Sequence, residues 1–109
     1  MPPNLNVIIK DTIKSASTSV EKGDTKRAYE EYVQLLENMK NNEKYSSLVS
    51  PSARELVEDS LVFSKMSDHD LDVKTSKLRD SLDRLYNEIR LPDVYKPSFG
   101  PLVSWFTTN

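Results

Sequence analysis

Residues 21–32 read EKGDTKRAYEEY, and this stretch decides the fold. Gly23 separates two segments in which apolar residues recur every three or four positions, as they do on one face of a helix. A glycine can end a helix in the left-handed conformation, which costs other residues energy. Asp24 or Thr25 can then cap the helix that follows. The stretch therefore predicts two antiparallel helices that meet at a tight elbow.

Outward from the elbow, the apolar spacing predicts helices over residues 6–21 and 25–40. The first helix places one stripe inward: Leu5, Ile9, Ile13, Ala16 and Val20. The second helix carries two adjacent stripes: Ala28, Tyr32, Leu35 and Met39 on one side, and Tyr29, Val33 and Leu36 on the other. An apolar face this wide is typical of a central helix with neighbours on both sides.

Two more helices are expected, over residues 51–65 and 69–90. Ser50 and Pro51 make an N-cap followed by proline at the first helical position, and Pro92 ends the last helix. Helix 51–65 should bury the residues Ala53, Leu56, Val57, Leu61 and Phe63. Helix 69–90 follows a capping-box pattern and has a coiled-coil-like seam: Leu71, Thr75, Leu78, Leu82, Leu85 and Ile89. Residues 41–49 read as a polar turn anchored by Tyr45, Leu48 and Val49.

Residues 92–109 differ in composition from the helical part, residues 1–91. They contain three prolines and one glycine, which disfavour a regular helix, yet hold four of the chain's nine aromatic residues. Three interpretations stay open for this tail: it packs on the bundle, it is a recognition segment for a partner or a second copy, or it is a linker within a longer protein. The sequence thus predicts an all-α antiparallel bundle of three to four helices, with an aromatic, proline-containing C-terminal tail packing on it.

Composition limits the classes of function. The chain has 109 residues, a net charge of −2 and no cysteine, which excludes disulfides and thiolate metal sites. The interspersed charges give no case for binding nucleic acid. The longest apolar run, residues 7–9, is far too short for an integral membrane segment. Because the N-terminus also lacks a signal-peptide pattern, we expect a cytoplasmic or nuclear protein.

The chemistry of catalysis and of metal binding is nearly absent from the sequence. The single histidine, His69, is flanked by two aspartates that point in different directions on a helix, so we interpret it as a solvated residue at a helix start. No nucleophile elbow or glycine-rich phosphate loop accompanies it. We therefore expect no enzyme activity, no cofactor and no metal.

Residues 13–37 resemble the first helical hairpin of the MIT (microtubule-interacting and transport) domain. The resemblance is carried by an alanine before the elbow, a glycine in the loop, an alanine five residues later and a tyrosine four beyond it: Ala16, Gly23, Ala28 and Tyr32. Tetratricopeptide hairpins and the related N-terminal helical domains of endosomal deubiquitinases look similar over this stretch. MIT domains bind peptide tails of ESCRT-III-type proteins, so the resemblance implies a role in endosomal sorting or ubiquitin-linked traffic.

The sequence therefore predicts a non-catalytic helical module for protein–protein interaction, with a protein or peptide partner. The candidate binding residues are the second stripe of helix 25–40 and the apolar residues of the tail: Tyr29, Val33, Leu36, Phe99, Leu102, Trp105 and Phe106. The stripe forms a groove only if later helices leave it uncovered, and ordinary core packing is the alternative. A structural domain that forms a homodimer through helix 69–90 or through the tail is the second hypothesis.

Overall fold

The computed structural model describes residues 4–66 and 68–90, which form five helices and no strand. The helices are α1 (Leu5–Glu21), α2 (Thr25–Asn41), α3 (Glu43–Ser46), α4 (Pro51–Ser64) and α5 (Leu71–Arg90). Residues 92–109, with the predicted binding residues Phe99, Leu102, Trp105 and Phe106, lie outside the described part of the chain. The prediction of an all-α fold is confirmed for the part described.

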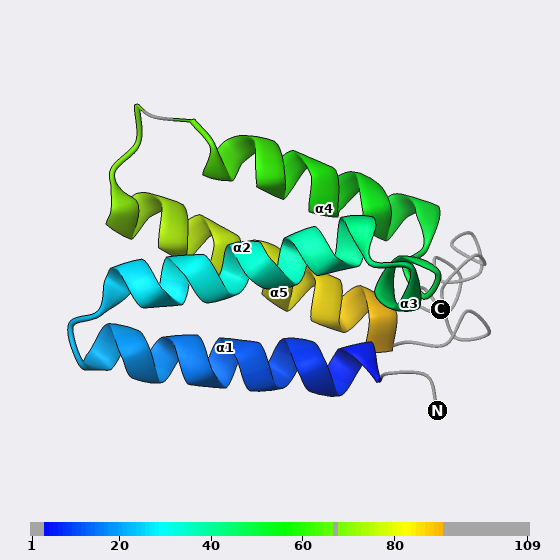
Figure 1. Ribbon diagram of the computed structural model, residues 1–109, viewed down its shortest axis with the longest axis horizontal. Coiled ribbons are helices and arrows are strands. Elements are labelled where there is room, and N and C mark those ends of the chain that lie inside the picture. The colour runs from blue at the N-terminus through cyan, green and yellow to red at the C-terminus, as the bar shows by residue number, and fades with distance from the viewer. Residues whose placement is uncertain (1–3, 67, 91–109) are drawn as a thin grey trace, which may run out of the picture.

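Among the four long helices, α2 and α5 form a central pair, and α1 and α4 pack against it. These two helices contact each other, and both also contact α1 and α4. Figure 1 shows α1 and α4 on opposite sides of the pair, with the short α3 at the end where α2 finishes. Following the colours, α2 and α5 run in one direction and α1 and α4 in the other. The central position expected for helix 25–40 from its wide apolar face is confirmed.

The elbow between α1 and α2 has the hydrogen bonds of a Schellman motif. Gly23 has φ +85°, in the left-handed region, and its N–H donates to the carbonyl of Val20 at 2.9 Å. The Asp24 N–H donates to the carbonyl of Ser19 at 2.8 Å, which completes the motif. The Asp24 carboxylate then accepts from the Arg27 N–H at 3.2 Å and caps α2. Of the two capping residues considered from the sequence, the structure uses Asp24.

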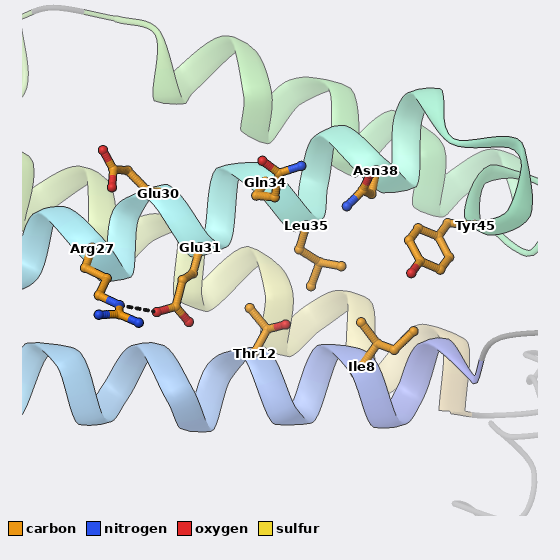
Figure 2. Close-up of a pocket in the computed structure, with 9 residues that line it drawn as sticks. All are labelled: Ile8, Thr12, Arg27, Glu30, Glu31, Gln34, Leu35, Asn38 and Tyr45. Carbon is orange, nitrogen blue, oxygen red and sulfur yellow. Dashed lines mark ion pairs between the residues drawn. The ribbon is translucent and has the colours of Figure 1, made fainter.

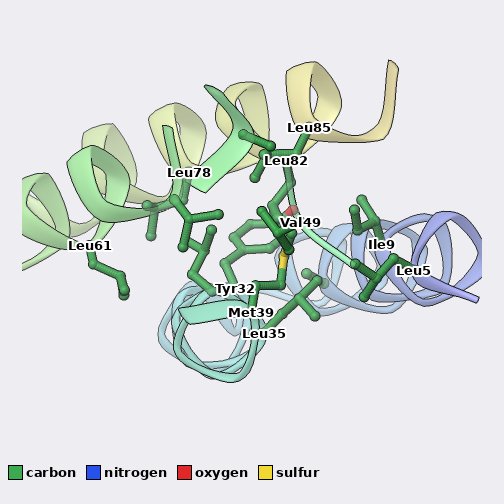
Figure 3. Packing of buried hydrophobic residues seen from close by; sticks show 14 of the residues in the cluster. Leu5, Ile9, Tyr32, Leu35, Met39, Val49, Leu61, Leu78, Leu82 and Leu85 are labelled. Carbon is green, nitrogen blue, oxygen red and sulfur yellow. The ribbon is translucent and has the colours of Figure 1, made fainter. Parts of the chain in front are cut away.

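The core is formed by most of the residues predicted to face inward on the four long helices, but Phe63 is only partly buried and lies outside this cluster. Its largest fully buried side chains are Tyr32, Ile9, Leu36, Met39, Leu78, Leu82, Leu85 and Val57. Figure 3 shows Tyr32 and Met39 of α2 reaching toward Leu78 and Leu82 of α5. Burial of each such side chain stabilises the fold by about 1.5–3 kcal/mol, so this layer holds the bundle together.

Buried hydroxyl groups complete the packing where the sequence pattern shows no large apolar residue. The Ser60 hydroxyl donates to the Leu56 carbonyl at 2.7 Å, and the Ser64 hydroxyl donates to the Leu61 carbonyl at 2.7 Å. Thr75 donates to the Leu71 carbonyl in the same way, at 2.8 Å. Because each hydroxyl is satisfied within its own helix, these small residues are buried without a lost hydrogen bond.

The structure corrects several details of the sequence prediction. Val20 is 42% exposed, because it lies at the rim of a recess between α1, α2 and α5 instead of in the core. Helix α5 begins at Leu71, two residues later than expected, because the Asp70 carboxylate accepts from the Val73 N–H at 3.1 Å and acts as its cap. Leu71 is consequently in the first turn of α5 and 36% exposed.

The connection between α2 and α4 also differs from the expected turn. It contains the short helix α3, which begins where the Asn42 side chain accepts from the Lys44 N–H at 3.1 Å. Two of the expected anchors are confirmed, since Val49 is buried and Tyr45 packs against the core. Leu48 is not an anchor, because 41% of its surface is exposed.

Candidate functional site

The second apolar stripe of α2, which the sequence singled out for partner binding, packs inside the bundle. Leu36 has no exposed surface, and Tyr29 and Val33 are partly buried against the core. The Tyr29 hydroxyl donates to the Ser64 carbonyl at 2.7 Å and thereby ties α2 to the end of α4. A partner-binding role for these three residues stays a prediction, and their packing gives it no support.

A groove lies instead between α1 and α2, with a volume of about 440 Å³. This α1/α2 groove is lined by Ile8, Thr12, Arg27, Glu30, Glu31, Gln34, Leu35, Asn38 and Tyr45. Figure 2 shows these side chains along the two helices, with Tyr45 contributed by α3. Its volume falls within the range of about 300–1,000 Å³ that is usual for ligand clefts.

The two helices that form the groove are held at the elbow by Gly23 and along their length by core contacts. Ile8 and Tyr45 pack against the core on one side, while Leu35 is almost fully buried beneath them. The apolar part of the groove thus rests on the core and is fixed by it.

The charged part of the groove contains an ion pair. Arg27 Nε and Glu31 Oε2 are 3.5 Å apart, in an i, i+4 arrangement on α2 (Figure 2). Such exposed pairs contribute about 0.3–0.5 kcal/mol, so the pair orients the two side chains without holding the fold together. Glu30 makes no ion pair within the described ranges. With one cation and two carboxylates, the groove has a formal charge of −1.

Reasoning from the sequence missed this groove because its residues come from three elements and follow no single periodicity. One signal was present in the run Val7-Ile8-Ile9. Ile8 lies beside the inward stripe of α1 and lines the groove. The contribution of Tyr45 could not be located without the position of α3.

A second recess, of about 490 Å³, lies where α1, α2 and α5 meet. Tyr32 reaches it from the core, and the Ser17 side chain lines the recess beside it. Burial raises the pKa of the Tyr32 hydroxyl above its ordinary value of 10.0, while the positive charge of Arg79 partly opposes this rise. The hydroxyl therefore stays protonated throughout the physiological range.

His69 lies at the α4–α5 connection and is exposed. Its ring centroid is 5.0 Å from that of Phe63, with an angle of 37° between the rings, and Lys77 Nζ is 6.0 Å from the centre of the Phe63 ring. Across residues 4–66 and 68–90, no three or more histidine, aspartate or glutamate side chains are placed together to hold a metal ion. Within the same ranges, no helix combines the length and apolarity that crossing a bilayer requires.

No protein-family model, curated protein or solved structure matches this chain. The described residues form an all-α helical domain with a groove between α1 and α2. In this structure the residues of the MIT-like pattern act as packing positions: Ala16 and Ala28 have no exposed surface, and Tyr32 is 1% exposed. The resemblance to the MIT hairpin itself stays a prediction.

Proposed function

We propose that this protein is a non-catalytic interaction module that binds a peptide segment of a protein partner in the α1/α2 groove. The observation that carries the proposal is the groove itself, which has an apolar floor supported by the core and polar groups along both walls. Helical domains commonly hold peptide segments between two helices in this way. The proposal moves the binding surface from the second stripe of α2 to the opposite side of that helix.

The resemblance over residues 13–37 directs the proposal toward endosomal sorting or ubiquitin-linked traffic. The first probes are therefore synthetic tail peptides of ESCRT-III-type proteins, and ubiquitin. Each is titrated into the isotope-labelled full chain while backbone amide signals are recorded. We expect one of them to shift the amide signals of Thr12, Gln34 and Asn38, and to leave those of Ser52–Glu58 on α4 unchanged.

The pattern of shifts decides between the parts of the proposal. Shifts centred on α4, or spread evenly over the chain, would contradict binding in the groove. If neither probe shifts any signal, the assignment to this pathway is wrong, and the groove is then tested with unbiased peptides as described below.

Self-association through helix 69–90 has less support as a function. Leu78, Leu82 and Leu85 form the centre of the seam that favoured it, and all three have no exposed surface within a single chain. The seam is used for contacts between α5 and the rest of its own bundle. A dimer through this seam would require the bundle to open.

A further inference from the structure

The α1/α2 groove changes character along its length (Figure 2). Toward α3 it presents apolar side chains: Ile8, Leu35 and Tyr45. Toward the elbow it presents ionisable side chains: Arg27, Glu30 and Glu31. A single peptide lying along the groove would therefore meet an apolar environment at one end and an acidic one at the other.

Between these ends, the walls carry side chains that can both donate and accept hydrogen bonds. Thr12 comes from α1, and Gln34 and Asn38 come from adjacent turns of α2. None of the three side chains hydrogen-bonds to another group in the described part of the chain. A helical partner satisfies most of its own backbone groups, whereas an extended peptide leaves its N–H and C=O groups free. The walls thus favour an extended segment.

The acidic end favours a basic side chain on the peptide. Glu31 is engaged by Arg27, but Glu30 has no ion pair among residues 4–66 and 68–90. A lysine or arginine of the partner can pair with Glu30 while the Arg27–Glu31 pair stays in place. An acidic peptide would instead face two carboxylates, and like charges across an interface are selected against.

The spacing of these features sets the spacing expected in the peptide. Leu35 lies about 7.5 Å from Glu30 along the axis of α2, and Asn38 lies about 12 Å from it. An extended chain advances about 3.3 Å per residue. The apolar and basic side chains of the peptide should therefore be two to four residues apart.

We infer that the occupant of the α1/α2 groove is an extended peptide segment with one apolar side chain and, two to four residues away, a lysine or arginine. This inference rests on the proposed function and adds the chemistry of the partner. Random twelve-residue peptides displayed on phage are selected against the immobilised full chain, and the enriched sequences are synthesised and titrated by calorimetry. We expect the enriched sequences to share the apolar and basic residues at this spacing.

Three variants of the full chain test where the enriched peptides bind. Glu30→Lys should weaken binding about five-fold, because it replaces an attraction by a repulsion. Glu58→Lys is the matched control: it makes the same change of charge at an exposed residue of α4 outside the groove, and it should leave the affinity within about two-fold. Asn38→Ala should weaken binding about two- to ten-fold by removing a hydrogen-bonding group. Circular dichroism checks that each variant keeps its thermal midpoint.

The outcomes separate this inference from the proposed function. Enriched peptides that lack a basic residue, that are helical when bound, or that respond equally to Glu30→Lys and Glu58→Lys overturn the inference. If such peptides still lose affinity with Asn38→Ala, binding in the groove stands. No enrichment, or enriched peptides that bind Glu30→Lys and Asn38→Ala as tightly as the unaltered chain, overturns the proposed function as well.

Discussion

At the scale of single residues, Gly23 holds a conformation that the other described residues avoid. Its φ of +85° is the only positive value among them, and a Cβ atom added there would meet nothing within 4 Å. The requirement for glycine therefore comes from backbone conformation and not from crowding. A side chain at this position costs energy even though there is room for it.

Gly23→Ala should lower the free energy of unfolding by about 1–2 kcal/mol, measured by urea denaturation. Gly23→Asn should cost less, because asparagine tolerates the left-handed region better than alanine does. Equal losses for the two variants would indicate that the elbow does not depend on the left-handed conformation.

Tyr29 connects α2 to the last turn of α4 through its hydroxyl, which is 2.7 Å from the Ser64 carbonyl oxygen. Tyr29→Phe should lower the free energy of unfolding by about 1 kcal/mol, because the carbonyl loses its hydrogen bond at a partly buried site. Tyr45→Phe is the control, since the Tyr45 hydroxyl makes no hydrogen bond in the described part of the chain. A similar loss for both substitutions would contradict the role of this hydrogen bond.

Tyr32 should make the stability of the fold depend on pH in the alkaline range. Its pKa is raised by burial, so the unfolded chain releases the proton at lower pH than the folded chain does. The contribution to stability is complete below the unfolded pKa, near 10, and is lost as pH rises through the folded pKa. We expect the urea midpoint to fall as the pH rises above about 10, and to fall less steeply in Tyr32→Phe.

At the scale of elements, α5 shows how the position of a leucine along one helix decides how much it contributes to stability. Leu82 has no exposed surface, whereas Leu71 is 36% exposed. Leu82→Ala should cost about 2–5 kcal/mol, because it removes transfer energy and leaves a cavity. Leu71→Ala makes the same chemical change on the same helix and should cost less than about 1 kcal/mol. Comparable losses in thermal or urea unfolding would show that α5 does not pack as described.

The four long helices could be predicted from the sequence because each one repeats its apolar stripe over several turns. The short helix α3 could not be, since four residues are too few to show a helical period. The start of α5 was predicted two residues too early because Ser67 and Asp70 can both cap a helix. Only the structure shows that the Asp70 side chain accepts a hydrogen bond from the Val73 N–H. The prediction of a groove along the second stripe of α2 is limited for a related reason. Periodicity shows which face of a helix is apolar, but it does not show which other helix covers that face.

At the scale of the whole molecule, we expect a monomer in solution from the surfaces of residues 4–66 and 68–90. The seam of α5 is buried within the chain. The exposed large apolar residues belong to α1, α4, α5 and the connections on either side of α4: Val7, Val20, Leu48, Val62, Met66, Leu71 and Val73. A stable dimer usually buries about 800 Å² on each partner, which scattered single side chains do not provide. Light scattering after size exclusion should give a mass near 12.5 kDa. A mass about twice this value would restore the hypothesis of a homodimer.

The sequence by itself determined the helical class, the elbow at Gly23 and the central place of helix α2, because these depend on backbone preferences and on periodicity within a single segment. Only the tertiary structure decided which apolar stripes are buried in the core and which surface stays exposed. Leu36 and Ile8 show the difference. Both are apolar residues on helices. Leu36 is covered where α4 and α5 complete the core, whereas Ile8 lines a groove together with Tyr45. Burial depends on what other elements bring to the same place, and that information is not contained in any one stretch of the chain.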